Sequence, residues 1–484
     1  MTCTRSIVRC HLLAGLLGGL MIALAGPASS VSASPAVVPL RGVVEGFYGT
    51  PWQQTERMDI LTFCGKQQLN AYIYAPKDDL YHRAKWREPY PPNKMTELAQ
   101  LIQTARLQGV RFVFAVSPGL DIHFTGFDGY KDKLAMEKKL SAMYDLGVRD
   151  FAIFFDDIKE KDGKGQADFL NWLNDHFIKA HPDISPLITV PTEYFYQDMQ
   201  ENGILKPYSH DFAAALESDI LVLYTGNQVV SDGITDAELA AADHLYGRNL
   251  GIWWNYPVTD YMENKLALGP VENLPHKSQM PAIFFNPMKH EQLSKIALAT
   301  GADYALDPFA YQPQQSWEKA IEKQYGALAP AMKQVAAQSQ HLENSWAKVG
   351  RPDGPALRKH MDIYWQTAEG SLQRQQAAQD ILHQLESLSQ SAGHLQAELP
   401  ASTLAECQPQ LQQLQRIIAA DKSGLALLTG HSSPNAPTAA DAAVLRETFV
   451  RQLQEVRLHD KEAVISETSA RAFLNELAAA AGVQ

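Results

Sequence analysis

Eight short apolar runs recur between residues 42 and 286, and they constrain the fold more than any other feature of the chain. Most of them are rich in Val, Ile, Phe or Tyr, the residues that favour strands. The runs are Gly42–Glu45, Ala71–Ala75, Arg111–Val116, Phe151–Phe155, Leu187–Val190, Ile220–Tyr224, Gly251–Trp254 and Ala282–Phe285. Several intervening segments have helical spacing of apolar residues. Eight strand–helix repeats predict an α/β fold, a (β/α)8 TIM barrel over residues 38–312. A doubly wound open sheet is the alternative, but it gives no reason for eight repeats.

The sequence changes character after about residue 316. Strand-like runs are no longer apparent, and Ala, Gln, Leu and Glu dominate. Apolar positions with helical spacing form two stripes, which are Ile381, Leu382, Leu385, Leu388 and Leu395, and then Leu411, Leu414, Ile417 and Ile418. The turn-rich segment 431–438 separates predicted helices. These features predict an all-α helical bundle domain over residues 316–484.

The N-terminus has the pattern of a secretory signal peptide over residues 1–33. Arg5 and Arg9 precede the apolar stretch Leu12–Ala25, and Val31-Ser-Ala33 fits the small-residue cleavage rule. We therefore expect a mature chain that starts near Ser34 and is exported, either periplasmic or secreted. No second apolar run is long enough to cross a bilayer, so no stable membrane insertion is expected after cleavage.

Charge and cysteine content exclude several classes of protein. The net charge of −12 argues against nucleic acid or an anionic membrane as a partner. Cys64 and Cys407 are the two cysteines left after signal removal, and we expect buried free thiols rather than a disulfide. No cluster has zinc-site spacing and no glycine-rich phosphate loop is present, so we expect no metal and no cofactor.

Asp156 and Asp157 stand side by side after the run Phe151–Phe155. Two adjacent carboxylates repel each other, whereas such a pair is a common acid/base device. In a barrel, catalytic groups stand at the C-terminal ends of the strands, which is where this pair is predicted to lie. The alternative is that Asp157 caps the next helix while Asp156 faces solvent.

Polar and aromatic residues also follow the other predicted strands. Rings can cover the C–H face of a sugar, and amides and carboxylates can bind its hydroxyls, so the pattern predicts a carbohydrate site. The candidates include Lys77, Tyr194, Trp253, Asn255, Asp260 and Asn286. Structural roles are the alternative: a salt bridge for Lys77, barrel core for Trp253 and turn caps for the asparagines. Glu45 and Glu193 are expected to hold neighbouring loops. Asp121 with His123 has the spacing of metal ligands, but a lone histidine is more often an ordinary loop residue, and we favour that interpretation.

Five motifs occur in an order that resembles the catalytic domain of glycoside hydrolase family 84. They are Arg41–Gly49, Tyr74–Asp79, Ser117–Asp121, Phe155–Ile158 and Pro191–Tyr194. This family contains the O-GlcNAcases and related bacterial β-N-acetylglucosaminidases, also called hyaluronidases. The resemblance covers about residues 38–310.

The resemblance implies a retaining mechanism in which the substrate's own 2-acetamido group is the nucleophile. Asp156 would orient the acetamido N–H, and Asp157 would be the general acid and later the general base. The resemblance also implies that Lys77 and the Gly46 backbone contact the sugar and that Tyr194 donates to the acetamido oxygen. Trp253, Thr225 and Val229 would line the acetamido pocket. Asn255 would be an active-site amide, and Asp260 and Asn286 would bind the far hydroxyls of the sugar.

The physics of the pair agrees with this mechanism. Ordinary retaining glycosidases place two carboxylates about 5–5.5 Å apart on either side of the bond. Adjacent aspartates cannot easily flank a substrate, but an acetamido oxygen could attack from the sugar itself and form an oxazoline. Asp157 must then begin protonated, and we expect the neighbouring carboxylate to raise its pKa.

We therefore expect an exo-β-N-acetylglucosaminidase acting on β-linked GlcNAc, with O-GlcNAc proteins as the leading substrate. A hydrolase of hyaluronan, chitin fragments or cell-wall amino sugars is the near alternative. A non-catalytic amino-sugar-binding module and a metal hydrolase using Asp121 and His123 are alternatives of other classes. The sequence identifies no partner for the helical domain.

Overall fold

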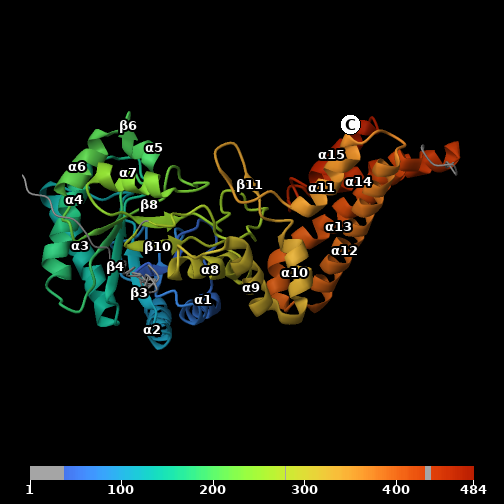
Figure 1. Cartoon of the computed structure of the whole chain (residues 1–484). Helices are drawn as coiled ribbons and strands as arrows, with labels where there is room; N and C mark the ends of the chain where they lie inside the picture. Colours follow the sequence, from blue (N-terminus) through green and yellow to red (C-terminus); the bar gives the residue numbers. More distant parts are fainter. Residues whose placement is uncertain (1–36, 278, 431–437, 484) are drawn as a thin grey trace, which may run out of the picture. The chain divides into compact units, whose positions relative to one another are not determined.

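Eight parallel strands close into a barrel in the computed structural model, which describes residues 37–277, 279–430 and 438–483 (Figure 1). The order around the barrel is β1-β10-β9-β8-β5-β4-β3-β2, so the first strand pairs with the last. The strands are β1 (Leu40–Glu45), β2 (Ala71–Tyr74), β3 (Arg111–Val116), β4 (Asp150–Phe154), β5 (Ile188–Val190), β8 (Leu221–Tyr224), β9 (Gly251–Trp254) and β10 (Ala282–Phe285). Each predicted apolar run coincides with one of them, and the predicted barrel is confirmed.

Alternating side chains of the strands divide between two buried layers. In β4, Ala152 and Phe154 face the barrel interior, whereas Phe151 and Ile153 pack under the surrounding helices. In β9, Trp253 points inward and Trp254 outward. Because both faces are covered, the strands are apolar throughout, as parallel strands in α/β proteins usually are.

Helices surround the strands, which are drawn in blue to yellow-green in Figure 1. The barrel region contains α1 (Gln54–Lys66), α2 (Pro92–Leu107), α3 (Gly126–Asp145), α4 (Gly163–Leu173) with a following π-helical turn (Asn174–Ile178), α5 (Tyr196–Met199), the hairpin strands β6 (Gln200–Glu201) and β7 (Ile204–Leu205), α6 (Pro207–Ala215), α7 (Asp236–Tyr246) and α8 (Glu291–Leu306).

One strand–helix repeat departs from the prediction. The connection between β9 and β10, residues 255–281, contains no helix in its described residues. Four prolines interrupt it, at positions 257, 270, 275 and 281, and proline removes a backbone donor and clashes with a helix interior. The prediction of eight complete repeats is therefore wrong at the seventh.

Helices dominate the rest of the chain, as predicted. They are α9 (Pro313–Tyr325), a 3-10 turn (Gly326–Leu328), α10 (Ala329–Ala336), α11 (Pro355–Gln366), α12 (Leu372–Glu398), α13 (Ala401–Gly430), α14 (Ala439–His459) and α15 (Ala470–Ala480). The predicted stripes lie on α12 and α13 and are buried, except that Leu382 is exposed. One short antiparallel hairpin, β11 (Leu342–Glu343) with β12 (Lys348–Val349), interrupts these helices and was not predicted from the sequence.

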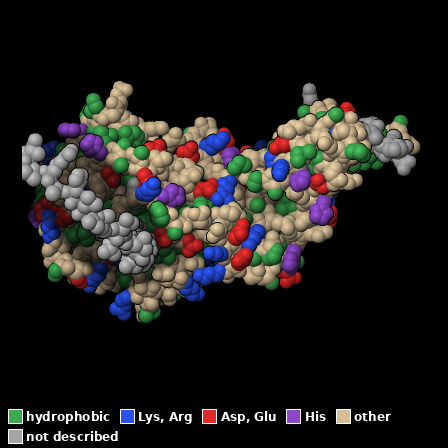
Figure 2. Space-filling view, viewed as in Figure 1, with side chains coloured by type: hydrophobic (Ala, Val, Ile, Leu, Met, Phe, Trp, Pro, Cys, Tyr) green, Lys and Arg blue, Asp and Glu red, His purple; other side chains and the backbone are tan. Residues whose placement is uncertain are grey.

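The barrel and the helical domain belong to one compact unit. Cys64 and Cys407 are free and buried, as expected. The predicted signal peptide and residues 431–437 lie outside the described residues. Among the described helices, none combines the length and apolar character needed to cross a membrane. Lys and Arg side chains lie among Asp and Glu on the face shown in Figure 2.

Candidate active site

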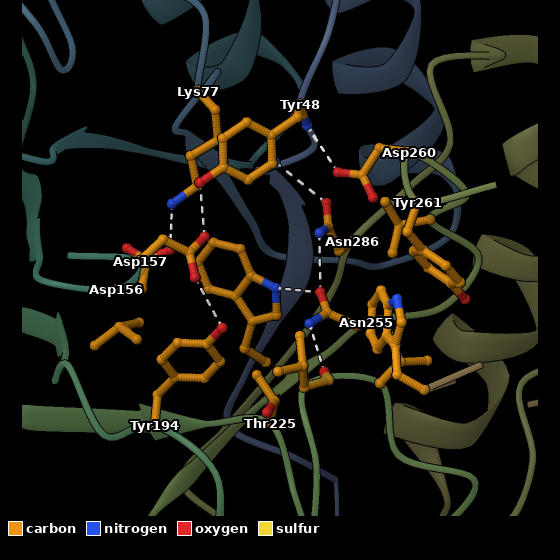
Figure 3. Close-up of a pocket in the computed structure, with 17 residues that line it drawn as sticks. Tyr48, Lys77, Asp156, Asp157, Tyr194, Thr225, Asn255, Asp260, Tyr261 and Asn286 are labelled. Atoms are coloured by element: carbon orange, nitrogen blue, oxygen red, sulfur yellow. Dashed lines mark hydrogen bonds and ion pairs between the residues drawn. The ribbon is translucent and has the colours of Figure 1, made fainter. Parts of the chain in front are cut away.

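A pocket of about 360 Å³ opens at the C-terminal ends of the barrel strands. This volume lies in the range of small-molecule sites. All the predicted site residues line it, several of which are labelled in Figure 3. They are Gly46, Lys77, Asp156, Asp157, Tyr194, Thr225, Val229, Trp253, Asn255, Asp260 and Asn286. The structure therefore brings residues from seven different strand ends to one place.

The backbone at Asp157 explains how two adjacent carboxylates can line one pocket. Successive side chains of a strand point to opposite faces. Strand β4 ends at Phe154, and Asp157 has a φ of 55°, in the left-handed region that few non-glycine residues adopt. Such strain is concentrated at functional sites. Asp157 does not cap the next helix, because Asp162 occupies that position and accepts the Gly165 N–H at 2.8 Å.

Asp156 is buried and forms an ion pair with Lys77 through its Oδ2 atom (Figure 3). Lys77 is buried as well, and its Nζ lies 5.8 Å from the ring centroid of Trp253. The second oxygen of Asp156, Oδ1, is buried without a hydrogen-bond partner among the described residues. An unpaired buried acceptor costs free energy, so this oxygen is suited to receive a donor from a ligand.

Asp157 accepts two tyrosine hydroxyl hydrogen bonds, from Tyr48 at 2.6 Å and from Tyr194 at 2.9 Å (Figure 3). Burial opposes ionisation of this carboxyl, but the Lys77 ammonium, the two hydroxyls and Arg83 outweigh it and hold its pKa below the ordinary value. The net shift of the Asp157 pKa is downward, so the expectation of a raised pKa is wrong. The sequence could not show that these four favourable partners come close to Asp157 in space.

A chain of hydrogen bonds fixes the wall opposite the aspartates. Asn255 Oδ1 accepts from Trp253 Nε1 at 2.8 Å and from Asn286 Nδ2 at 2.9 Å. Asn286 Oδ1 in turn accepts the Gly46 N–H at 3.3 Å. A Cβ atom at position 46 would lie 2.3 Å from the indole of Trp253, so only glycine fits there. The wall is therefore preorganised.

Asp260 completes the polar lining. Its carboxylate accepts the Tyr48 N–H at 2.8 Å, and burial raises its pKa. Thr225 donates its hydroxyl to the carbonyl of Gln228 at 2.7 Å, so that hydroxyl is already engaged within the protein. Val229 adds an apolar surface beside it.

Two buried glutamates support the site without lining it. Glu45 accepts two hydrogen bonds from Arg57, at 2.8 and 2.7 Å, and one from the Trp52 N–H at 3.2 Å. Glu193 accepts from Ser209 at 2.6 Å. Both carboxylates hold neighbouring segments, as expected from the sequence.

The proposed metal-ligand spacing does not form a site with the aspartate pair. Asp121 pairs with Arg87 at 2.5 Å, and His123 Nδ1 lies 3.1 Å from Asp132. Neither Asp121 nor His123 lines the pocket. No group of three metal-binding side chains occurs in the part of the chain that the structure describes.

Six residues that were not predicted from the sequence also line the pocket: Tyr48, Val190, Val230, Val258, Tyr261 and Trp346. Tyr48 lies inside the motif Arg41–Gly49, and Tyr261 directly follows the predicted site residue Asp260, so the sequence pointed to both positions. Trp346 lies between β11 and β12, far along the chain from the barrel strands. Nothing in its sequence neighbourhood links it to the barrel.

Comparison with known proteins agrees with this geometry. Residues 41–338 match the family described as beta-N-acetylglucosaminidase, and residues 356–474 match the hyaluronidase post-catalytic domain-like family. The chain belongs to glycoside hydrolase family 84, the β-N-acetylglucosaminidases. Membership of this hydrolase family decides against the alternative of a non-catalytic sugar-binding module.

The relatives include proteins of animals and bacteria. The protein O-GlcNAcases of Mus musculus and Rattus norvegicus are each 31% identical over 280 residues, covering 55% of this chain. The chain spans only 30% of the length of these relatives. The structure of CpGH84B has a TM-score of 0.86 at 35% identity, covering 92% of this chain and 77% of its own. A mutant Thermobaculum terrenum O-GlcNAc hydrolase has a TM-score of 0.80 at 25% identity, covering 92% and 96%.

Proposed function

We propose that the protein is an exported, retaining exo-β-N-acetylglucosaminidase that removes β-linked GlcNAc from proteins by substrate-assisted catalysis. The family supports the reaction class. The N-terminal signal pattern supports export.

The unpaired oxygen of Asp156 carries the proposal. This Oδ1 atom is buried and has no donor among the described residues, while Oδ2 is held by Lys77. The N–H of a 2-acetamido group would satisfy it, and a charged acceptor makes a strong hydrogen bond. Polarising that N–H increases the negative charge on the acetamido oxygen and aims it at C1 of the sugar.

The reaction then needs one proton donor. The acetamido oxygen bonds to C1 as the bond from C1 to the glycosidic oxygen breaks, and Asp157 gives its proton to the departing oxygen. The amide proton moves toward Asp156, leaving an oxazoline. Asp157, now ionised, takes a proton from water as that water bonds to C1 and the C1–O bond of the oxazoline breaks. The proton held by Asp156 returns to the nitrogen, which restores the acetamido group, and the two inversions at C1 retain the β configuration.

Substrate binding provides a reason for Asp157 to gain its proton. Tyr194 donates its hydroxyl to Asp157, and the family resemblance assigns this hydroxyl to the acetamido oxygen. If the hydroxyl turns to the substrate, Asp157 loses one of the partners that hold its pKa down.

Asp260 is the other pocket carboxylate that could serve as a nucleophile. It is engaged by the Tyr48 N–H at 2.8 Å, and burial raises its pKa, so it holds a proton more readily than an ordinary aspartate. These properties suit a ligand for sugar hydroxyls better than an attacking carboxylate.

Two substrate classes are favoured by the comparisons. The mouse, rat and Thermobaculum relatives are named for O-GlcNAc hydrolysis. The family matched by residues 356–474 is named for hyaluronidase, which favours hyaluronan as the second candidate.

Release of free GlcNAc tests the proposal. A peptide carrying O-GlcNAc on serine, a hyaluronan oligosaccharide and chitobiose would be incubated with the enzyme at equal concentration of terminal sugar. We expect the glycopeptide to have the highest kcat/KM. Faster cleavage of internal hyaluronan linkages would overturn both the exo mode and the protein substrate. Cell fractionation and N-terminal sequencing test export, with a start near Ser34 expected.

A further inference from the structure

The connection 255–281 between β9 and β10 carries the pocket residues Asn255, Asp260 and Tyr261. The described residues of this connection form no helix. In a (β/α)8 barrel each strand is normally followed by a helix of the outer ring. The chain must therefore fix this part of the sugar site by other contacts.

The helical domain supplies several of these contacts. The buried Lys265 ammonium forms an ion pair with Glu467. The Val464 N–H donates to the carbonyl of Asn264 at 2.9 Å, and the Leu268 N–H donates to the carbonyl of Ser339 at 2.8 Å. Residues 264–268 are thus held by chain that follows the barrel.

The β11–β12 hairpin brings a second part of the rim. It carries Trp346, whose ring centroid lies 5.1 Å from that of Tyr261 at the pocket. The hairpin is fixed at its base by buried Asp353, whose Oδ1 accepts the Gln340 and His341 N–H groups at 2.7 and 2.9 Å.

Glu467 joins both parts. Its side chain pairs with Lys265, and its backbone N–H donates to Asp353 Oδ2 at 2.8 Å. It precedes α15 in a segment in which Ser466 and Ser469 are fully buried. Ser466 and Ser469 both donate to Gln338 Oε1, at 2.7 and 2.8 Å, so the segment is itself firmly held.

We propose that Glu467 of the helical domain is a positioning residue of the sugar site, which sets Asp260 and Tyr261 through Lys265 and sets Trp346 through Asp353. This inference rests on the proposed function, because it assigns Asp260 to sugar hydroxyls. Asp260 and the rim aromatics do not touch the bonds that break, so their displacement weakens binding more than chemistry.

Two substitutions separate the two links. Glu467→Gln removes the charge that pairs with Lys265. Asp353→Asn can keep its oxygen toward Gln340 and His341 while its NH2 faces the Glu467 N–H, donor against donor. Glu476→Gln is the matched control, because Glu476 lies in α15 and binds Arg358 at 2.8 Å and Trp365 at 2.6 Å, away from the pocket.

The assay is hydrolysis of an aryl β-GlcNAc and of its 4-deoxy and 6-deoxy analogues. We expect Glu467→Gln to raise KM about tenfold and to change kcat by less than about threefold. The tenfold change corresponds to the loss of one good hydrogen bond to a charged group. The penalty should shrink with the analogue that lacks the hydroxyl bound by Asp260. Asp353→Asn should raise KM in the same direction, and Glu476→Gln should leave it unchanged. The double variant Lys265→Glu with Glu467→Lys restores an ion pair of reversed polarity, so its KM should lie closer to that of the unsubstituted enzyme than the KM of Glu467→Gln does.

A KM for Glu467→Gln equal to that of Glu476→Gln would overturn the inference, as would an equal penalty with all three sugars. If Glu467→Gln does not fold, the same comparison with Asp353→Asn decides. Failure of the proposed β-N-acetylglucosaminidase activity is seen separately, because the unsubstituted enzyme would then not hydrolyse the aryl β-GlcNAc at all.

Discussion

Asp157→Asn is the substitution that isolates proton transfer in this site. Asp157 has a φ of 55°, and asparagine is the residue other than glycine that best tolerates this left-handed backbone. The amide also has nearly the same shape, so the Tyr48 and Tyr194 hydroxyls, at 2.6 and 2.9 Å, can still find a partner. The change therefore removes the proton without moving the chain.

The size of the effect depends on the leaving group. General acid catalysis contributes about 10²–10⁴-fold. A serine alkoxide needs that proton, so kcat/KM for a glycopeptide should fall by about 10³-fold, equivalent to roughly 4 kcal/mol. A dinitrophenolate leaves without a proton, so kcat/KM for the dinitrophenyl glycoside should fall by less than about tenfold.

Stability supplies the control. Asp157→Ala should cost roughly 1–2 kcal/mol in the free energy of unfolding, because alanine disfavours the left-handed backbone, whereas Asp157→Asn should cost less. The assay is steady-state hydrolysis of the two glycosides beside urea unfolding of both variants. An equal loss of activity with both leaving groups for Asp157→Asn would refute the assignment of Asp157 as the general acid.

Three further predictions concern the pocket and its support. Asp156→Asn should slow both leaving groups alike, by about 10²-fold or more, because the acetamide loses its charged partner; a loss limited to the glycopeptide would contradict this. Tyr48→Phe removes a donor that stabilises ionised Asp157, so the pKa of Asp157 rises, the acid keeps its proton to higher pH, and the alkaline limb of kcat/KM should move upward. A downward move would contradict the reasoning. Glu45→Gln leaves the buried Arg57 without its charge partner and should lower the free energy of unfolding by about 3–5 kcal/mol in urea titrations.

The barrel was predictable because its strands are buried on both faces. A strand as apolar as Phe151–Phe155 must be buried on both faces, and a barrel covered by helices buries it between the barrel interior and those helices. The missing seventh helix was less visible, since prolines spaced through residues 255–281 disfavour a helix but do not show what replaces it.

The pocket residues were predictable where they follow a strand directly. Asp156 and Lys77 belong to this group, because parallel strands end at the same rim. Trp346 could not be found this way, because a hairpin in the helical region brings it to the rim. The direction of the pKa shift of Asp157 could not be predicted from the sequence either, since it depends on burial and on how close Lys77, Tyr48 and Tyr194 come in space.

Fluorination of the acetamido group tests the central claim most directly. Aryl β-GlcNAc and its N-fluoroacetyl, N-difluoroacetyl and N-trifluoroacetyl analogues differ only in the electron density on the carbonyl oxygen. If that oxygen is the nucleophile aimed by Asp156, kcat/KM should fall steeply with each added fluorine. An unchanged kcat/KM across the series would contradict substrate assistance and point instead to attack by a carboxylate of the protein.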